Sequence, residues 1–170
     1  FLYDPANRLV AFKSGHLDSK LAVVVIGGLT DGLLSLPYIT ALSDACEKSG
    51  HSLIQPILRS SYNGFGHHSL EHDAEDLTIL LNLLRDFGYI SVHLVGHSTG
   101  CQDILWLLRS FRSDIIKTIT LQGPVSDADY IQNNLQELVN RYNSSKTEYE
   151  TDSDFVLPFT LFGAPITSYR

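Results

Sequence analysis

The stretch ISVHLVGHSTGC, residues 90–101, joins an apolar run to a helical pattern. ISVHLV has the length and the β-branched residues of a buried strand, and CQDILWLLRSF follows it with helical periodicity. Between the two, GHSTG satisfies the pattern Gly-x-Ser-x-Gly, which places a serine on a tight strand-to-helix turn. Gly96 and Gly100 leave room for neighbouring backbone at that turn, and His97 fills the first variable position. The stretch predicts that Ser98 is a nucleophile at the end of a strand.

Strand-like and helix-like segments alternate around this motif. Apolar runs of strand length occupy Arg8–Ser14, Leu21–Ile26, Ser52–Leu58, Ile90–Val95 and Ile116–Gln122. Helical patterns occupy Leu36–Gly50, Leu70–Gly88 and Cys101–Phe111. Strands that alternate with helices favour an α/β fold, with a mostly parallel sheet and helices on both faces. We expect one domain, because 170 residues is an ordinary domain length.

Composition narrows the class of partner. The chain has 12 basic and 19 acidic residues, a net charge of −7, and no Lys/Arg cluster, so nucleic acid is not an expected partner. No apolar stretch approaches the ~20 residues that span a bilayer, so neither a membrane anchor nor a signal peptide is expected. Cys46 and Cys101 are too few for a disulfide framework, which favours a reducing, cytoplasmic location.

The last third of the chain differs in character. Residues 128–143 predict an amphipathic helix, residues 144–154 a polar connector, and residues 155–170 an apolar tail interrupted by proline. We expect residues 128–170 to begin a cap or lid over the rest of the domain. The chain begins with Phe1 and contains no methionine, which indicates a portion of a longer polypeptide.

A second glycine-rich segment, GGLTDG at residues 27–32, follows the strand LAVVVI. In acyl-transfer enzymes of this architecture, the loop after that strand supplies half of an oxyanion hole. The predicted donors are the backbone N–H groups of Leu29 and Thr99. A phosphate-binding loop does not fit, because the glycines are wrongly spaced and Leu33 stands where a P-loop needs lysine. A plain structural turn remains open.

Two further segments carry weaker signals. HSLEH, residues 68–72, matches the His-x-x-Glu-His order of some zinc peptidases, but no third ligand stands out. Helix capping by Ser69 or His68 is the preferred interpretation, and neither a metal nor a cofactor is expected. The loop RSSYNGFG, residues 59–66, lies where ligands bind in open α/β sheets. Tyr62, Phe65 and Gly28 are therefore candidate pocket residues, although an ordinary loop is as good an interpretation.

The segments VVVIGGLTDGLLSLPY, SSYNGFG and GHSTGCQD together resemble the α/β-hydrolase superfamily. In their detailed residues, these segments are similar to a plant and fungal branch of the superfamily that includes a fungal siderophore esterase. The resemblance implies an α/β-hydrolase fold without its C-terminal strands, a small or medium organic ester as substrate, and no cofactor. It also implies an acid and a histidine after Ser98 in chain order.

The histidines depart from that order, because all seven precede Ser98. A serine hydroxyl without a base is a weak nucleophile, and His97 is a poor base because adjacent side chains diverge on so tight a turn. Asp127 or Asp129, which follow the strand Ile116–Gln122, would serve as the acid only if this chain places the acid earlier than the superfamily pattern does. We therefore expect the acid and the histidine beyond residue 170, with the missing part or a partner covering the sheet edge. The competing hypothesis is a non-catalytic module that binds a ligand or a protein.

Overall fold

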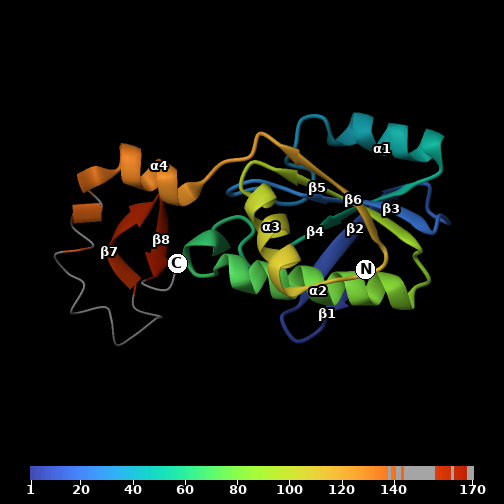
Figure 1. Ribbon diagram of the computed structural model, residues 1–170, viewed down its shortest axis with the longest axis horizontal. Helices are drawn as coiled ribbons and strands as arrows, with labels where there is room; N and C mark the ends of the chain where they lie inside the picture. Colours follow the sequence, from blue (N-terminus) through green and yellow to red (C-terminus); the bar gives the residue numbers. More distant parts are fainter. Residues whose placement is uncertain (138, 141–142, 144–155, 162, 168–170) are drawn as a thin grey trace.

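Six strands form one sheet in the order β1-β2-β4-β3-β5-β6 (Figure 1). The computed structural model describes residues 1–137, 139–140, 143, 156–161 and 163–167. Strands β3, β4, β5 and β6 are parallel, whereas β2 is antiparallel to both β1 and β4. The strand bounds are β1 Leu2–Asp4, β2 Leu9–Gly15, β3 Leu21–Ile26, β4 Ser52–Pro56, β5 Ser91–His97 and β6 Ile116–Gln122.

Helices cover both faces of the sheet. Helix α1 (Ile39–Ser49) packs on one face, and α2 (Leu70–Asp86) and α3 (Gly100–Ser110) pack together on the other (Figure 1). Alternate residues of each strand point to opposite faces, so the sheet has two hydrophobic cores. The parallel sheet with helices on both faces confirms the α/β prediction.

Local signals explain where the helices begin and end. Ser69 caps α2 by accepting a hydrogen bond from the N–H of His72, and Glu71 and Asp73 place negative charge in its first turn. Helix α1 ends at Gly50, whose φ of +72° lies in the left-handed region that glycine adopts readily. The predicted helices therefore form, with ends that shift by a few residues.

The sheet contains features that the periodicity did not reveal. Strand β1 has only 3 residues, too few for a recognisable alternation. Strand β2 was expected from its sequence, but its direction was not. It pairs antiparallel with β4, and the pattern of apolar residues does not specify the direction of a strand. At the other edge, β6 pairs with β5 alone within the described part of the chain, and residues 117–120 are exposed.

The C-terminal segment forms a smaller unit beside the sheet (Figure 1). Helix α4 spans Asp127–Asn134, and helical residues follow at 136–137, 139–140 and 143. Strand β7 (Val156–Leu161) pairs with β8 (Ala164–Thr167) as an antiparallel hairpin. The expected connector, residues 144–154, lies outside the described residues. Strand β8 contacts the short 3₁₀ helix η1 (Gly64–Gly66), which joins this hairpin to the main domain.

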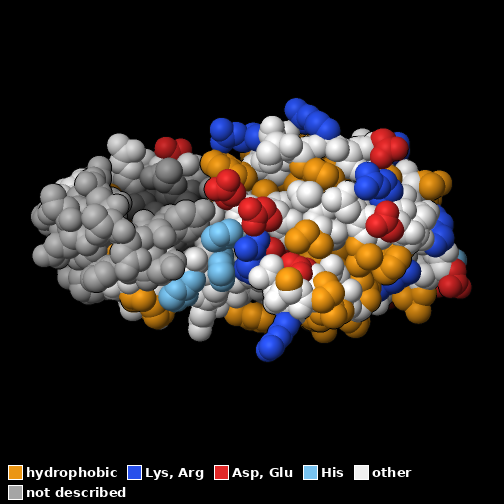
Figure 2. Space-filling view, turned by 90° about the horizontal axis from the view of Figure 1, so that it is seen from below, with side chains coloured by type: hydrophobic (Ala, Val, Ile, Leu, Met, Phe, Trp, Pro, Cys, Tyr) orange, Lys and Arg blue, Asp and Glu red, His pale blue; other side chains and the backbone are white. Residues whose placement is uncertain are grey.

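Charged side chains are dispersed over the molecular face seen in Figure 2. Acidic and basic groups alternate there with hydrophobic ones, and no broad basic patch forms among the residues described on that face. On this face, therefore, no local basic patch offsets the net charge of −7. Within the described residues, no helix has the length and apolar character needed to cross a membrane.

Candidate active site

Ser98 stands on the turn between β5 and α3 in a strained conformation. Its φ is +53°, a region that non-glycine residues rarely occupy. Its backbone N–H donates to the carbonyl of Gln122 at 2.9 Å, which holds the turn against the end of β6. Its hydroxyl forms no hydrogen bond within the part of the chain that the structure describes. A serine with positive φ between a strand and a helix is the geometry that the Gly-x-Ser-x-Gly pattern predicts.

The two glycines of the motif are required by close packing. A Cβ on Gly96 would lie 2.7 Å from the carbonyl oxygen of Gly100, and a Cβ on Gly100 would lie 2.4 Å from that of Gly27. Both separations are shorter than a carbon and an oxygen tolerate. The backbone of the elbow therefore approaches the glycine-rich loop after β3 directly.

The glycine-rich loop folds against the serine. Its turn is closed by Asp31, whose carboxylate accepts from the N–H of Gly28 at 2.6 Å and whose own N–H donates to the Gly28 carbonyl at 3.0 Å. A Cβ on Gly28 would lie 3.0 Å from the Cβ of Ser98. Thr30 has a φ of +67°, a rare conformation for a β-branched residue. The hydrogen bonds of Asp31 therefore hold the glycine-rich loop in a defined conformation beside Ser98.

The two predicted oxyanion donors lie on either side of this junction. The N–H groups of Leu29 and Thr99 form no hydrogen bond to the described residues. Thr99 precedes α3, whose N-terminal end carries a partial positive charge. Donors of this kind suit the negative charge that develops on a carbonyl oxygen during acyl transfer.

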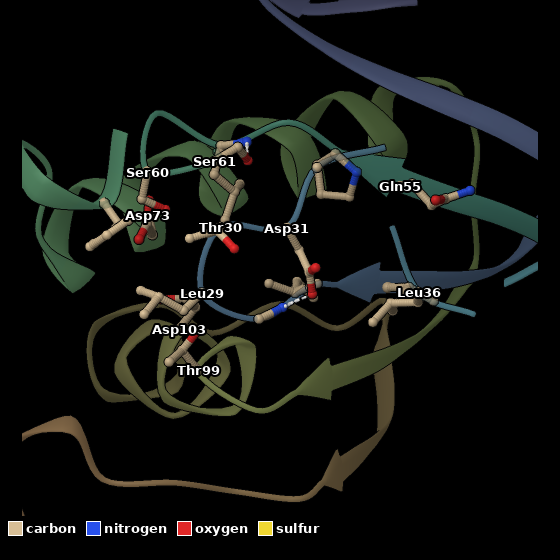
Figure 3. A pocket seen from close by; sticks show the side chains of 18 residues that line it. Leu29, Thr30, Asp31, Leu36, Gln55, Ser60, Ser61, Asp73, Thr99 and Asp103 are labelled. Carbon is tan, nitrogen blue, oxygen red and sulfur yellow. Dashed lines mark hydrogen bonds between the residues drawn. The ribbon is translucent and has the colours of Figure 1, made fainter. Parts of the chain in front are cut away.

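A small cavity of about 40 Å³ opens beside the loop (Figure 3). Gly28, Leu29 and Thr99 line it, and Phe65 from η1 closes one side with only 2% of its surface exposed. Tyr62 is not among the lining residues: it is 52% exposed, and its hydroxyl accepts from the N–H of Leu33. Tyr62 therefore supports the glycine-rich loop from outside.

Buried charge anchors the loop that carries Phe65. The Asp76 carboxylate on α2 accepts from the guanidinium and from the backbone N–H of Arg59, each at 2.8 Å. Glu75 also accepts from this guanidinium at 2.8 Å. Burial raises the pKa of Asp76 to about 6, although the bonds and charge of Arg59 oppose that shift. This network ties the end of β4 to α2 and so fixes one wall of the cavity.

The Nδ1 side of the His97 ring faces Gln122. Its Nδ1 lies 3.1 Å from Oε1 of Gln122, and its ring packs edge-on against Tyr38 with centroids 6.2 Å apart. No hydrogen bond joins His97 to Ser98 within the described residues, and the expectation that His97 is a poor base for Ser98 stays a prediction. Asp129 is exposed on α4, and the side chain of Asp127 lies outside the described residues, so neither is placed as an acid here.

His72, His93 and Cys101 have structural partners. His72 completes a capping box with Ser69, as its Nδ1 accepts from the Ser69 N–H at 3.4 Å. No group of three or more metal-ligating side chains occurs among the described residues. The ring of His93 bonds to Thr118 and Thr120 of β6. Cys101 is buried, which raises the pKa of its thiol, and it donates to the Gly96 carbonyl.

Three residues of the site were not singled out from the sequence. Asp31 carried a weak signal, since an aspartate within a glycine-rich turn often bonds to nearby backbone. No signal in the sequence marked Tyr38 and Gln122, because they come from distant positions and meet only when β6 pairs with β5. The short hydrogen bond from the Tyr38 hydroxyl to Oε1 of Gln122 joins residues 84 positions apart.

A mostly parallel sheet that presents a strained serine between a strand and a helix, beside a glycine-rich loop, defines the α/β-hydrolase fold. Similarity to known proteins agrees with this class. The model of the DUF1749 family, described as a protein of unknown function, matches residues 2–167. The chain belongs to this family.

Fungal proteins are among its relatives. It is 30% identical over 176 residues to "Esterase AN6793" of Emericella nidulans, covering 84% of this chain and 47% of that protein. It is 31% identical over 96 residues to "Fusarinine C esterase sidJ" of Aspergillus fumigatus, covering 51% and 27%. These matches confirm the predicted resemblance to a branch that includes a fungal siderophore esterase. The chain spans less than half the length of the curated relatives it matches.

A solved structure shares the fold over nearly the whole chain. The siderophore hydrolase EstB from Aspergillus fumigatus superposes with a TM-score of 0.73 at 22% sequence identity, covering 99% of this chain and 61% of that one. At that identity the likeness shows the fold. The part of the fold that the two share makes up about three fifths of the EstB chain.

Proposed function

We propose that this chain is the N-terminal part of a serine ester hydrolase in which Ser98 is the nucleophile. The observation that carries the proposal is the strained φ of +53° at Ser98, on a turn that packs against a glycine-rich loop. Strain of this kind costs on the order of 1–3 kcal/mol and persists where the surrounding structure enforces it. A turn with no chemical role has no need of a serine there, since glycine adopts this conformation without strain.

The reaction follows from the groups that surround the serine. The Ser98 hydroxyl oxygen attacks the ester carbonyl, and its proton passes to a histidine that we place beyond residue 170, together with the acid that orients it. The N–H groups of Leu29 and Thr99 stabilise the oxyanion. The tetrahedral intermediate expels the alcohol, which takes the proton from the histidine, and water then hydrolyses the acyl-enzyme. No step requires a cofactor.

Relatives support the reaction class. Two curated relatives carry the name esterase, and the similarity to one of them covers most of this chain. The substrate we propose is a small or medium organic ester. The small cavity of about 40 Å³ would admit a compact group beside the scissile bond.

A fluorophosphonate probe tests the assignment, because it phosphonylates only an activated serine. We expect the intact protein, with the part that follows residue 170, to be labelled, and peptide mapping to place the label on Ser98. Heat-denatured protein is the control and should not react. A label on another serine would contradict the role of Ser98, and no label at all would favour the binding-module hypothesis.

We also propose that residues 128–170 begin a cap over the site. The Thr167 hydroxyl on β8 donates to the Gly66 carbonyl at 3.3 Å, and a Cβ on Gly66 would lie 1.8 Å from the carbonyl oxygen of Pro165. Gly66 follows Phe65, the residue that closes one side of the cavity. The hairpin therefore rests on the loop that shapes the pocket.

Replacing Thr167 with valine tests this contact. The change keeps the shape of a side chain that is 5% exposed but leaves the Gly66 carbonyl without its donor. We expect kcat/KM for a bulky ester to fall about fivefold, as one hydrogen bond is worth about 1 kcal/mol. Thr160→Val, at an exposed residue of β7, is the matched control and should behave as the wild type. An equal effect of both variants would contradict the cap.

A further inference from the structure

Gln122, the last residue of β6, contacts three separate groups of the candidate site. Its backbone carbonyl accepts from the N–H of Ser98 at 2.9 Å. Its side-chain Oε1 accepts from the Tyr38 hydroxyl and lies 3.1 Å from Nδ1 of His97. One residue thus joins the elbow, the residue before the nucleophile and the start of α1.

These contacts determine where the proton of His97 lies. An amide oxygen can only accept hydrogen bonds, so the His97 nitrogen that faces it, Nδ1, carries the hydrogen. Burial and the charge of Asp31 raise the pKa of Tyr38, which keeps its hydroxyl protonated and available to donate to the same oxygen. In the neutral imidazole Nε2 is then an acceptor.

The free edge of the His97 ring lies beside the glycine-rich loop, close to where that loop meets Ser98. A Cβ placed on Gly28 would lie 3.4 Å from Cδ2 of His97 and 3.0 Å from the Cβ of Ser98. Cδ2 is bonded to Nε2, so this edge of the ring adjoins the glycine-rich loop and the serine. Within the described residues, Nε2 of His97 forms no hydrogen bond. Edge-on packing against Tyr38 keeps the ring in this orientation.

We propose that His97 determines substrate specificity by accepting a hydrogen bond at Nε2. The donor would be a hydroxyl or N–H group of the substrate close to the scissile carbonyl. Gln122 and Tyr38 are positioning residues that fix the tautomer and the orientation of the ring. The inference rests on the proposed function and narrows its substrate class to esters that carry such a donor, for example 2-hydroxy acid esters. It requires no proton transfer by His97.

Two esters that differ by one hydroxyl test the proposal in the intact protein. The measured quantity is the ratio of kcat/KM for phenyl 2-hydroxypropanoate to kcat/KM for phenyl propanoate. We expect His97→Phe to lower this ratio about fivefold, the effect of one lost hydrogen bond. His97→Gln should recover part of it, because its amide oxygen reaches the region of Nε2. Gln122→Leu should also lower the ratio, because it removes the oxygen that keeps the hydrogen on Nδ1 of His97 while the imidazole itself remains.

His93→Phe is the matched control, since it makes the same substitution on β5 away from the loop. A ratio that is unchanged in both His97→Phe and Gln122→Leu would overturn the role of His97, even if both esters react more slowly. A fall of the ratio in His97→Phe that His97→Gln does not partly restore would indicate lost packing, and it would also contradict the proposed role of His97. Hydrolysis of neither ester by the wild type, with no fluorophosphonate label, would overturn the proposed function as well. Labelling without a preference for the hydroxy ester would overturn this inference alone.

Discussion

Ser98→Ala in the intact protein is expected to lower kcat/KM for ester hydrolysis by a factor of about 10³ or more. The variant loses the only atom that forms the covalent bond to the acyl group, so the remaining catalysis comes from the oxyanion donors and from binding. The backbone should hold its shape, because alanine and serine pay a similar cost at a φ of +53°. The free energy of unfolding should therefore change little.

The measurement compares initial rates with a chromogenic ester and follows unfolding in denaturant. Ser110→Ala is the matched control, because this exposed serine ends α3 far from the elbow. It should keep both wild-type rate and wild-type stability. Full activity of Ser98→Ala would show that another residue is the nucleophile, whereas loss of activity together with loss of stability would show that the change acts through the fold.

Gly100→Ala is expected to destabilise the protein by about 3 kcal/mol and to remove most of its activity. The added Cβ would stand 2.4 Å from the Gly27 carbonyl oxygen and 2.5 Å from that of Ile26. Both atoms belong to the backbone at the end of β3, so no side chain can turn aside to make room. Helix α3 would have to move away from the strand, which displaces Ser98 and Thr99 relative to the glycine-rich loop. Displacements of about 1 Å at reacting groups cost about 10²-fold in rate.

Gly50→Ala separates this clash from the general cost of replacing a glycine. A Cβ on Gly50 meets no atom within 4 Å, but its φ of +72° makes alanine unfavourable there. We expect a loss of about 1 kcal/mol in the free energy of unfolding and an unchanged kcat/KM. Equal stability of Gly100→Ala and the wild type, measured by denaturant unfolding, would contradict the close approach of α3 to β3.

Much of the fold was predictable because its signals are local. Strands β3 and β6 have the bounds expected from their apolar runs, Leu21–Ile26 and Ile116–Gln122. The stripe of leucines in α2 is buried as its periodicity of 3.6 residues requires. The elbow was predictable for the same reason, since glycine, serine and the flanking elements lie within a dozen residues.

Other features depend on pairings and contacts that the local pattern of residues does not specify. The three-residue strand β1 forms because the chain reverses onto β2. The hairpin of β7 and β8 was expected only as an apolar tail. Its contact with Gly66 joins residues 101 positions apart, which the local pattern does not report. A periodicity of apolar residues reports which face is buried and not which partner buries it.

The sequence by itself determined the α/β class, the serine at the elbow and the glycine-rich loop beside it, because short-range geometry demands particular residue types there. It also showed that all seven histidines precede Ser98. Only the tertiary structure decided which way His97 faces. That orientation depends on Gln122 and Tyr38, which lie 25 positions after and 59 positions before His97. They come together through the parallel pairing of β5 with β6 and the packing of α1 beside them, a long-range arrangement that leaves no trace in the local pattern of residues.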